Sequence, residues 1–143
     1  MKMKIEGLDE LNAVLAKFPA EFKREAAALV NRTAQNIRNT AVQSIVREPS
    51  SGNTYEKYTP GRTHTASAPG QPPNTDTGRL AGSIRAVMSG TSSAHVEALA
   101  DYAVHLEFGT RSMAARPFMT PAVEQERPNY ERGLRELTRR AAK

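Results

Sequence analysis

The sequence predicts one α+β domain over residues 1–143: a long amphipathic helix packed on a small antiparallel sheet, with a C-terminal helix and a long polar loop. Apolar residues recur every three or four positions from residue 20 to about residue 48, which is the period of a helix face. Apolar and polar residues alternate on both sides of a turn at residues 90–93, which is typical of a β-hairpin. A second helical pattern follows at residues 120–142.

The composition predicts a small core. A chain of 143 residues that is 38% hydrophobic and 6% aromatic, without Trp, favours a subunit that completes its packing against copies of itself or other partners. The absence of Cys excludes disulfides and thiolate metal sites. No apolar run approaches the roughly 20 residues of a membrane helix, and the first residues lack the apolar stretch of a signal peptide. We therefore expect the protein to stay in the cytoplasm in which it is made, without membrane contact.

The helical pattern begins with a short amphipathic helix, expected from about Leu8 to Phe18, which Pro19 interrupts. The main scaffold helix is expected from Ala20 to about Glu48, roughly 40 Å long at about 1.5 Å per residue. This is more than a domain of this size covers, so part of its apolar face is expected to meet the sheet and part a neighbour. That face comprises Phe22, Ala26, Leu29, Thr33, Ile37, Ala41 and Ile45.

Residues 49–75 are rich in Ser, Gly and Pro, and Tyr55 and Tyr58 are their only large apolar side chains. Loops of this length inside a compact domain are uncommon and are usually functional or disordered. One interpretation is a flexible insertion. The interpretation we prefer is an arm that orders against an adjacent subunit, with the two tyrosines as anchors and Arg62 among its basic residues.

Residues 75–77 can cap a helical turn that ends near Gly82. Within it, Arg79 is expected to form an ion pair inside or between subunits, because no glycine-rich phosphate loop surrounds it. The hairpin that follows is only marginally stable alone. It needs the scaffold helix on one face and further strand from the N-terminus, from residues 112–116 or from a neighbouring subunit.

Two helix boundaries close together predict a sharp corner after the hairpin. Asp101 is expected to cap a short helix from Tyr102 to Phe108, with Gly109 in the left-handed turn that ends it. The apolar residues expected to hold this corner are Tyr102, Leu106, Phe108 and Phe118.

The C-terminal helix is expected to begin at the same corner. Pro117 fits a first-turn position, and Thr120 followed by Pro121 resembles a cap before a helical proline. Pro128 is expected to kink or restart this helix. Its inward residues are predicted to be Ala122, Leu134 and Leu137, and its water-facing residues to be Glu124, Glu126, Arg132, Arg135, Glu136, Arg139 and Arg140.

No catalytic or metal-binding pattern is present in the sequence. The three histidines stand alone at positions 64, 95 and 105, without ligand spacing, and no serine lies in a nucleophile motif. The one reaction centre that can be constructed uses Asp101 or Glu107 as a base, with Arg111 and Arg116 holding an anion. Acid–base catalysis needs partly buried, perturbed groups, whereas these residues are typical of caps and surface pairs. We therefore expect no enzyme, cofactor or metal.

Three separated motifs resemble one known family. Residues 74–84 read NTDTGRLAGSI and residues 102–122 read YAVHLEFGTRSMAARPFMTPA. The Asp-Thr-Gly-Arg-Leu segment, the Tyr-Ala…Glu-Phe-Gly-Thr segment and the Arg-Pro-Phe plus Pro-Ala corner occur in this order after one long helix. In this arrangement the chain closely resembles, over nearly its whole length, the small tail-component proteins of tailed bacteriophages, which act in tail completion or head–tail joining.

The resemblance implies a structural virion protein that assembles in the host cytoplasm into a ring of the phage neck or tail. It also implies six copies in the ring and other neck or tail-tube proteins as partners. Terminator, tail-completion and head-closure roles share this kind of sequence. The residues expected at contacts between subunits are Tyr55, Tyr58, Arg62, Arg79, Arg111 and Arg116.

The net charge of +5 leaves an alternative open, a small basic nucleic-acid-binding protein. Basic residues are spread among Glu residues along both long helices and form no block of like charge. This pattern favours at most non-specific contact with packaged DNA.

Overall fold

The computed structural model describes residues 1–4, 13, 16–47, 50–56, 61 and 63–143. The helix expected at residues 8–18 lies mostly outside these residues. The elements run in the order β1 (Lys2–Lys4), α2 (Ala20–Arg47), β2 (Thr54–Glu56), β3 (Thr63–Thr65), α3 (Arg79–Ser83), β4 (Ile84–Met88), β5 (Ala94–Ala98), α4 (Ala103–Phe108) and α5 (Met119–Ala141). The α+β class predicted from the sequence is confirmed, with the long helix, the antiparallel strands and the C-terminal helix in their expected places.

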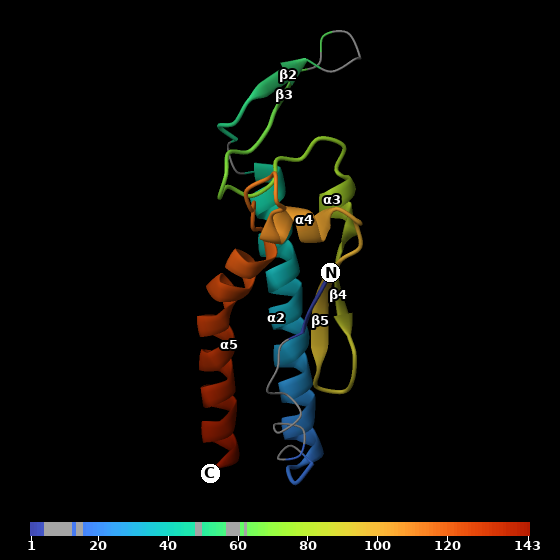
Figure 1. Cartoon of the computed structure of the whole chain (residues 1–143). Helices are drawn as coiled ribbons and strands as arrows, with labels where there is room; N and C mark the ends of the chain where they lie inside the picture. Colours follow the sequence, from blue (N-terminus) through green and yellow to red (C-terminus); the bar gives the residue numbers. More distant parts are fainter. Residues whose placement is uncertain (5–12, 14–15, 48–49, 57–60, 62) are drawn as a thin grey trace.

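Helix α2 is the central element, with α5 along one side and the three-stranded sheet along the other (Figure 1). All seven residues predicted for its apolar face are buried, together with Val30 and Ala34. The apolar residues of this face from Val30 to Ile45 form the main core with Ile84 and Val96 of the sheet and with Phe118 and Met119 at the start of α5. The helical period of the sequence therefore identified the core face correctly.

The sheet has the order β1-β5-β4, and both pairs are antiparallel. The expected hairpin is β4 and β5, and the further strand comes from the N-terminus. β1 pairs Lys2 with Glu97, and the amino group of Met1 donates to the carbonyl of Ala98 at 3.1 Å. Alternate residues of β5 are buried against α2, which fits the expected one-sided burial. Among the described residues, β4 pairs on one side only and leaves its other edge open.

The segment expected as a long polar loop contains a small hairpin of its own, β2 paired with β3. It projects beyond the end of α2 (Figure 1). At its base, Gly52 donates its N–H to the carbonyl of Ala66 at 2.8 Å. A Cβ at Gly52 would lie only 2.5 Å from that carbonyl oxygen, so this close pairing of the two chains requires glycine.

Helix α5 continues through Pro128 without interruption, so of the two expectations for this proline, a kink or a restart, the restart is wrong. It packs along α2, with Leu137 joining Phe22 and Ala26 in a second, smaller core cluster. The prediction that Glu126 faces water is wrong. Its side chain is buried, and its carboxylate accepts a hydrogen bond from the Asn129 amide at 3.4 Å.

Candidate functional site

The corner between α4 and α5 is built around the carboxylate of Glu107, which is only 3% exposed. One carboxylate oxygen accepts the backbone N–H groups of Phe118 at 2.9 Å and Met119 at 3.0 Å, and the other accepts that of Thr120 at 2.8 Å. These N–H groups belong to the first turn of α5 and have no partner within the helix. Glu107 therefore caps α5 from a different helix.

The electrostatics of this contact stabilise the charged carboxylate. Burial by itself raises the pKa of Glu107, but the hydroxyl of Thr120 and the three backbone N–H groups outweigh that cost and leave the pKa below its ordinary value. The positive end of the α5 dipole acts in the same direction. Glu107 is thus a buried capping anion. The interpretation of these residues as caps fits Glu107, whereas the interpretation as surface pairs does not.

Gly109 turns the chain back from α4 with a positive φ, as predicted, but its ψ lies outside the left-handed helical region that the sequence led us to expect. Its φ is +74° and its ψ is 178°, a conformation almost restricted to glycine. A Cβ there would also lie 2.8 Å from both the Ala115 nitrogen and the Met113 oxygen. Beyond the turn, the N–H of Arg116 donates to the carbonyl of Leu106 at 2.6 Å, which closes the corner.

Several predicted details of the corner are wrong. Helix α4 starts at Ala103. The carboxylate of Asp101 accepts the backbone N–H of Tyr102 at 3.1 Å but bonds no N–H of the helix itself, so it does not cap the helix. Helix α5 starts at Met119, which places Pro117 before the helix and Thr120 inside it, and makes Glu107 the cap in place of Thr120. Phe118 is fully buried as expected.

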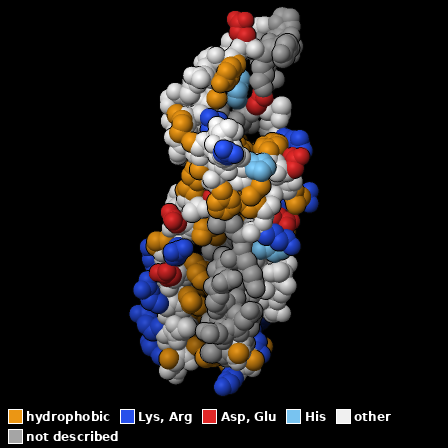
Figure 2. All heavy atoms as spheres, in the orientation of Figure 1, with side chains coloured by type: hydrophobic (Ala, Val, Ile, Leu, Met, Phe, Trp, Pro, Cys, Tyr) orange, Lys and Arg blue, Asp and Glu red, His pale blue; other side chains and the backbone are white. Residues whose placement is uncertain are grey.

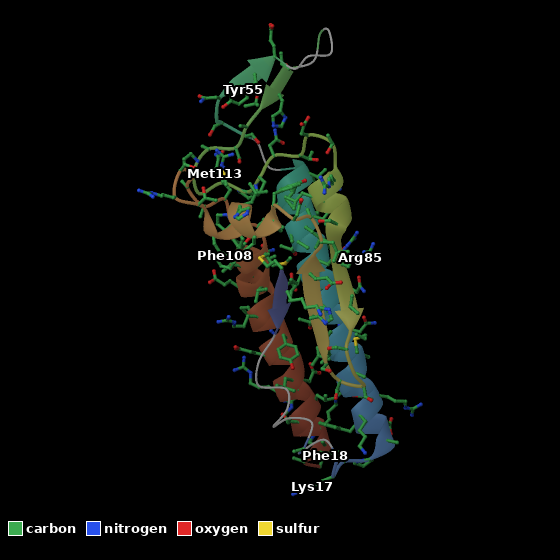
Figure 3. The ribbon with its side chains drawn as sticks, turned by 45° about the vertical axis from the view of Figure 1, so that its right-hand side comes forward. Lys17, Phe18, Tyr55, Arg85, Phe108 and Met113 are labelled. Carbon is green, nitrogen blue, oxygen red and sulfur yellow. The ribbon has the colours of Figure 1, made fainter. Side chains whose placement is uncertain are left out.

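Helix α4 exposes Phe108, which was predicted to be buried in the corner. The buried residues of the helix are Ala103 and Glu107, whereas Phe108 is 65% exposed and Val104, one turn earlier, is 41% exposed. Tyr102 and Leu106 are half-buried. Figure 3 shows Phe108 on the outside of the molecule, and Figure 2 shows hydrophobic side chains gathered across the middle of this face. Phe108 therefore does not hold the corner from within.

The residues expected at subunit contacts are distributed over two regions. Tyr55 is exposed on the projecting hairpin, far from α4 (Figure 3), and Arg111 is exposed next to the corner. Arg79 lies over the ring of Tyr102 at 5.5 Å and pairs with Asp101 at 3.4 Å, so the expected ion pair forms within the chain. Tyr58 and Arg62 lie outside the described residues.

Arg79 and Arg116 are brought together at one cavity, of about 240 Å³. Its walls come from three segments that are separate in the sequence: the base of the β2–β3 hairpin, residues 73–80, and the corner. The amide of Asn74 fastens two of them by donating to the carbonyl of Thr65 at 2.6 Å. The arm and both longer motifs singled out in the sequence thus meet at this cavity, which residue spacing alone did not predict.

In the part of the chain that the structure describes, no group of three or more His, Asp or Glu side chains is placed to hold a metal ion. Among the described helices, none is both long enough and apolar enough to cross a membrane. Comparison of the chain with protein-family models, curated proteins and solved structures finds no match.

Proposed function

We propose that the protein is a structural assembly subunit of a phage neck or tail, which joins copies of itself in a ring that completes the tail or connects it to the head. The proposal rests on the motif resemblance and on one structural observation, the exposed apolar face of α4. A structural subunit of this kind needs no reaction centre, because its role is to present surfaces to other chains.

The α4 face supports this proposal because α4 is held rigidly while its apolar residues point outward. Ala103 and Glu107 anchor the inner side of the helix, and the Gly109 turn sets its end. This packing fixes Phe108 and Val104 on the outer side of α4, where the contact of their apolar side chains with water is unfavourable. Burial against another chain removes that cost, and aromatic side chains commonly anchor such interfaces.

The β2–β3 hairpin and the open edge of β4 are compatible with the same role. The hairpin carries the exposed Tyr55 away from the body of the molecule, where it can reach a neighbour. An open strand edge offers backbone hydrogen-bonding groups to a further strand. In a closed ring such contacts are repeated at every subunit, so each needs to contribute only a modest free energy.

The experiment is removal of the protein from a producing phage, followed by complementation and negative-stain imaging of the particles. We expect particles without the protein to have incomplete or detached tails, and wild-type protein to restore them. Phe108→Ser should fail to restore assembly. Val46→Ser is the matched control, because Val46 is 51% exposed but lies on α2, and it should restore normal particles. Normal particles in the absence of the protein would refute the proposal.

Non-specific DNA contact remains the second candidate, favoured by the outer surface of α5. Figure 2 shows Lys and Arg side chains along the lower left side of the molecule, where α5 lies in Figure 1. The exposed arginines of α5 are Arg127, Arg132, Arg135, Arg139 and Arg140, with Glu124, Glu131 and Glu136 among them. If phosphate contacts drive function, DNA affinity falls steeply with salt, and salt titration of binding distinguishes this candidate from the first.

A further inference from the structure

Strand β4 pairs with β5 on one side, and its hydrogen bonds show which of its backbone groups point to the open edge. Next to the strand, the N–H of Leu99 donates to the carbonyl of Ser83 at 3.1 Å. Bonded and non-bonded positions alternate along an antiparallel ladder. The residues of β4 whose N–H and C=O groups point outward are therefore Ile84, Ala86 and Met88.

Part of this edge is already occupied. The Nε of Arg38, on α2, donates to the outward carbonyl of Ile84 at 3.3 Å. The outward groups of Ala86 and Met88 have no hydrogen-bond partner within the described part of the chain. An unpaired strand edge is a template for pairing with another chain. The space left here suits a short strand that ends beside Arg38.

Strand β2, in the projecting hairpin, is short and has an open edge of its own. Its three residues are exposed, and among the described strands it pairs only with β3. The N–H of Ala66 donates to the carbonyl of Asn53 at 2.9 Å, so the next residue of β2 bonded to β3 is Tyr55. Thr54 and Glu56 therefore direct their backbone groups away from β3. A hairpin of two strands is only marginally stable alone, so β2 gains from a further neighbour.

The two edges are complementary when β2 of one copy runs antiparallel to β4 of another. The facing pairs are Glu56 with Ala86, Tyr55 with Val87 and Thr54 with Met88. Tyr55, which is 53% exposed, then packs on Val87, and aromatic side chains pair favourably with β-branched ones across strands. Ala86 packs against the core on the α2 side. Glu56 points to that side too, where Arg38 comes from α2, so opposite charges meet at the end of the added strand.

We propose that β2 of one copy adds to the open edge of β4 in the next copy, so that the two subunits share one antiparallel sheet. This contact specifies how the copies in the proposed ring join, and it rests on that assembly role. Tyr55 and Arg85 of β4 lie far apart within one chain (Figure 3), so the contact cannot form inside a subunit. Because the hairpin and the edge are different surfaces, the contact repeats head to tail and closes into a ring where the rotation between copies allows.

The test is disulfide cross-linking in particles complemented with the double variant Tyr55→Cys/Val87→Cys, since the chain has no Cys of its own. A facing non-bonded pair has its Cα atoms about 4.5 Å apart, which suits a disulfide. Oxidation should give a ladder of products at multiples of 15.6 kDa on a non-reducing gel. Tyr55→Cys/Arg85→Cys is the matched control, because the Cα atoms of diagonal residues lie about 7–8 Å apart, and it should give several-fold less product.

The outcomes separate this contact from the assembly role. Wild-type protein missing from the particles refutes both, whereas the double variant present without a ladder overturns the contact alone. Equal product in the two double variants overturns it as well, because cross-linking would then be unspecific. Dimers of Val87→Cys alone would assign the edge to β4 of a second copy, and products of another mass would assign it to a different protein. Either result overturns the proposal.

A proline variant tests the edge independently of cysteine. Met88→Pro removes an N–H that points outward, where proline is tolerated on an edge strand, so its unfolding temperature should stay near that of Met88→Ala. It also removes a bond to the added strand, so we expect Met88→Pro to fail to restore particles that Met88→Ala restores. Restoration by Met88→Pro overturns the proposal. Where Met88→Pro does not fold, the cross-linking result decides.

Discussion

Replacement of Glu107 by Gln tests whether one buried carboxylate couples the two halves of the corner. Gln has one acceptor oxygen where Glu107 has two. If that oxygen serves Phe118 and Met119, the Gln amide faces the N–H of Thr120 and leaves it unsatisfied, at a cost of about 1–3 kcal/mol. Loss of the negative charge at the start of α5 adds roughly 1 kcal/mol. We expect unfolding to require about 2–4 kcal/mol less free energy at pH 7, and Tm to fall by roughly 10 °C.

Urea unfolding followed by circular dichroism measures this loss, and Glu124→Gln, on the exposed side of α5, is the control that should leave stability unchanged. The pH dependence gives a second check. Because the folded pKa of Glu107 is lowered, its contribution is fully present above the unfolded pKa and disappears as the pH falls through the folded pKa. The difference between the wild type and Glu107→Gln should therefore be constant near neutral pH and shrink below about pH 4.5. A difference under about 0.5 kcal/mol at pH 7 would refute the capping role.

Three further substitutions test the corner, the core and the exposed face by the same unfolding measurement. Gly109→Val should lower the free energy of unfolding by more than about 3 kcal/mol, because backbone strain adds to a clash with the chain at residues 113–115. Gly70 also has a positive φ but lies in open space, so Gly70→Val should lose only the contribution of the strain. Equal losses in the two variants would contradict the clash. Ile45→Ala, at a residue 1% exposed, should lose about 2–5 kcal/mol, and Val46→Ala beside it should lose under about 1 kcal/mol. Phe108→Ser should change stability by less than about 0.5 kcal/mol, so that any effect on assembly arises from the surface; a large loss would place Phe108 in the fold.

The elements with strong local patterns were predictable from the sequence. The apolar stripe of α2 repeats every three or four residues from Phe22 to Ile45, so its buried face follows from helix geometry whatever packs against it. The alternation in β5 and the turn before it predict the hairpin for a similar reason. Gly109 was also predictable, because a glycine directly after a helix commonly takes positive φ.

Tertiary structure decided the features that depend on distant partners. Glu107 caps residues that are 11 to 13 positions away, and no local sequence motif identifies a glutamate on one helix that caps the start of the next helix. The same fold turns Phe108 outward, because α4 uses its Ala103 and Glu107 side for packing and a short helix buries one side only. Three segments spread over more than 50 residues converge on the cavity of Ser67 and Arg116, so its position could not be obtained from spacing. Local periodicity thus determined which elements form and which of their faces are apolar, whereas the packing of those elements decided which polar side chains are buried together.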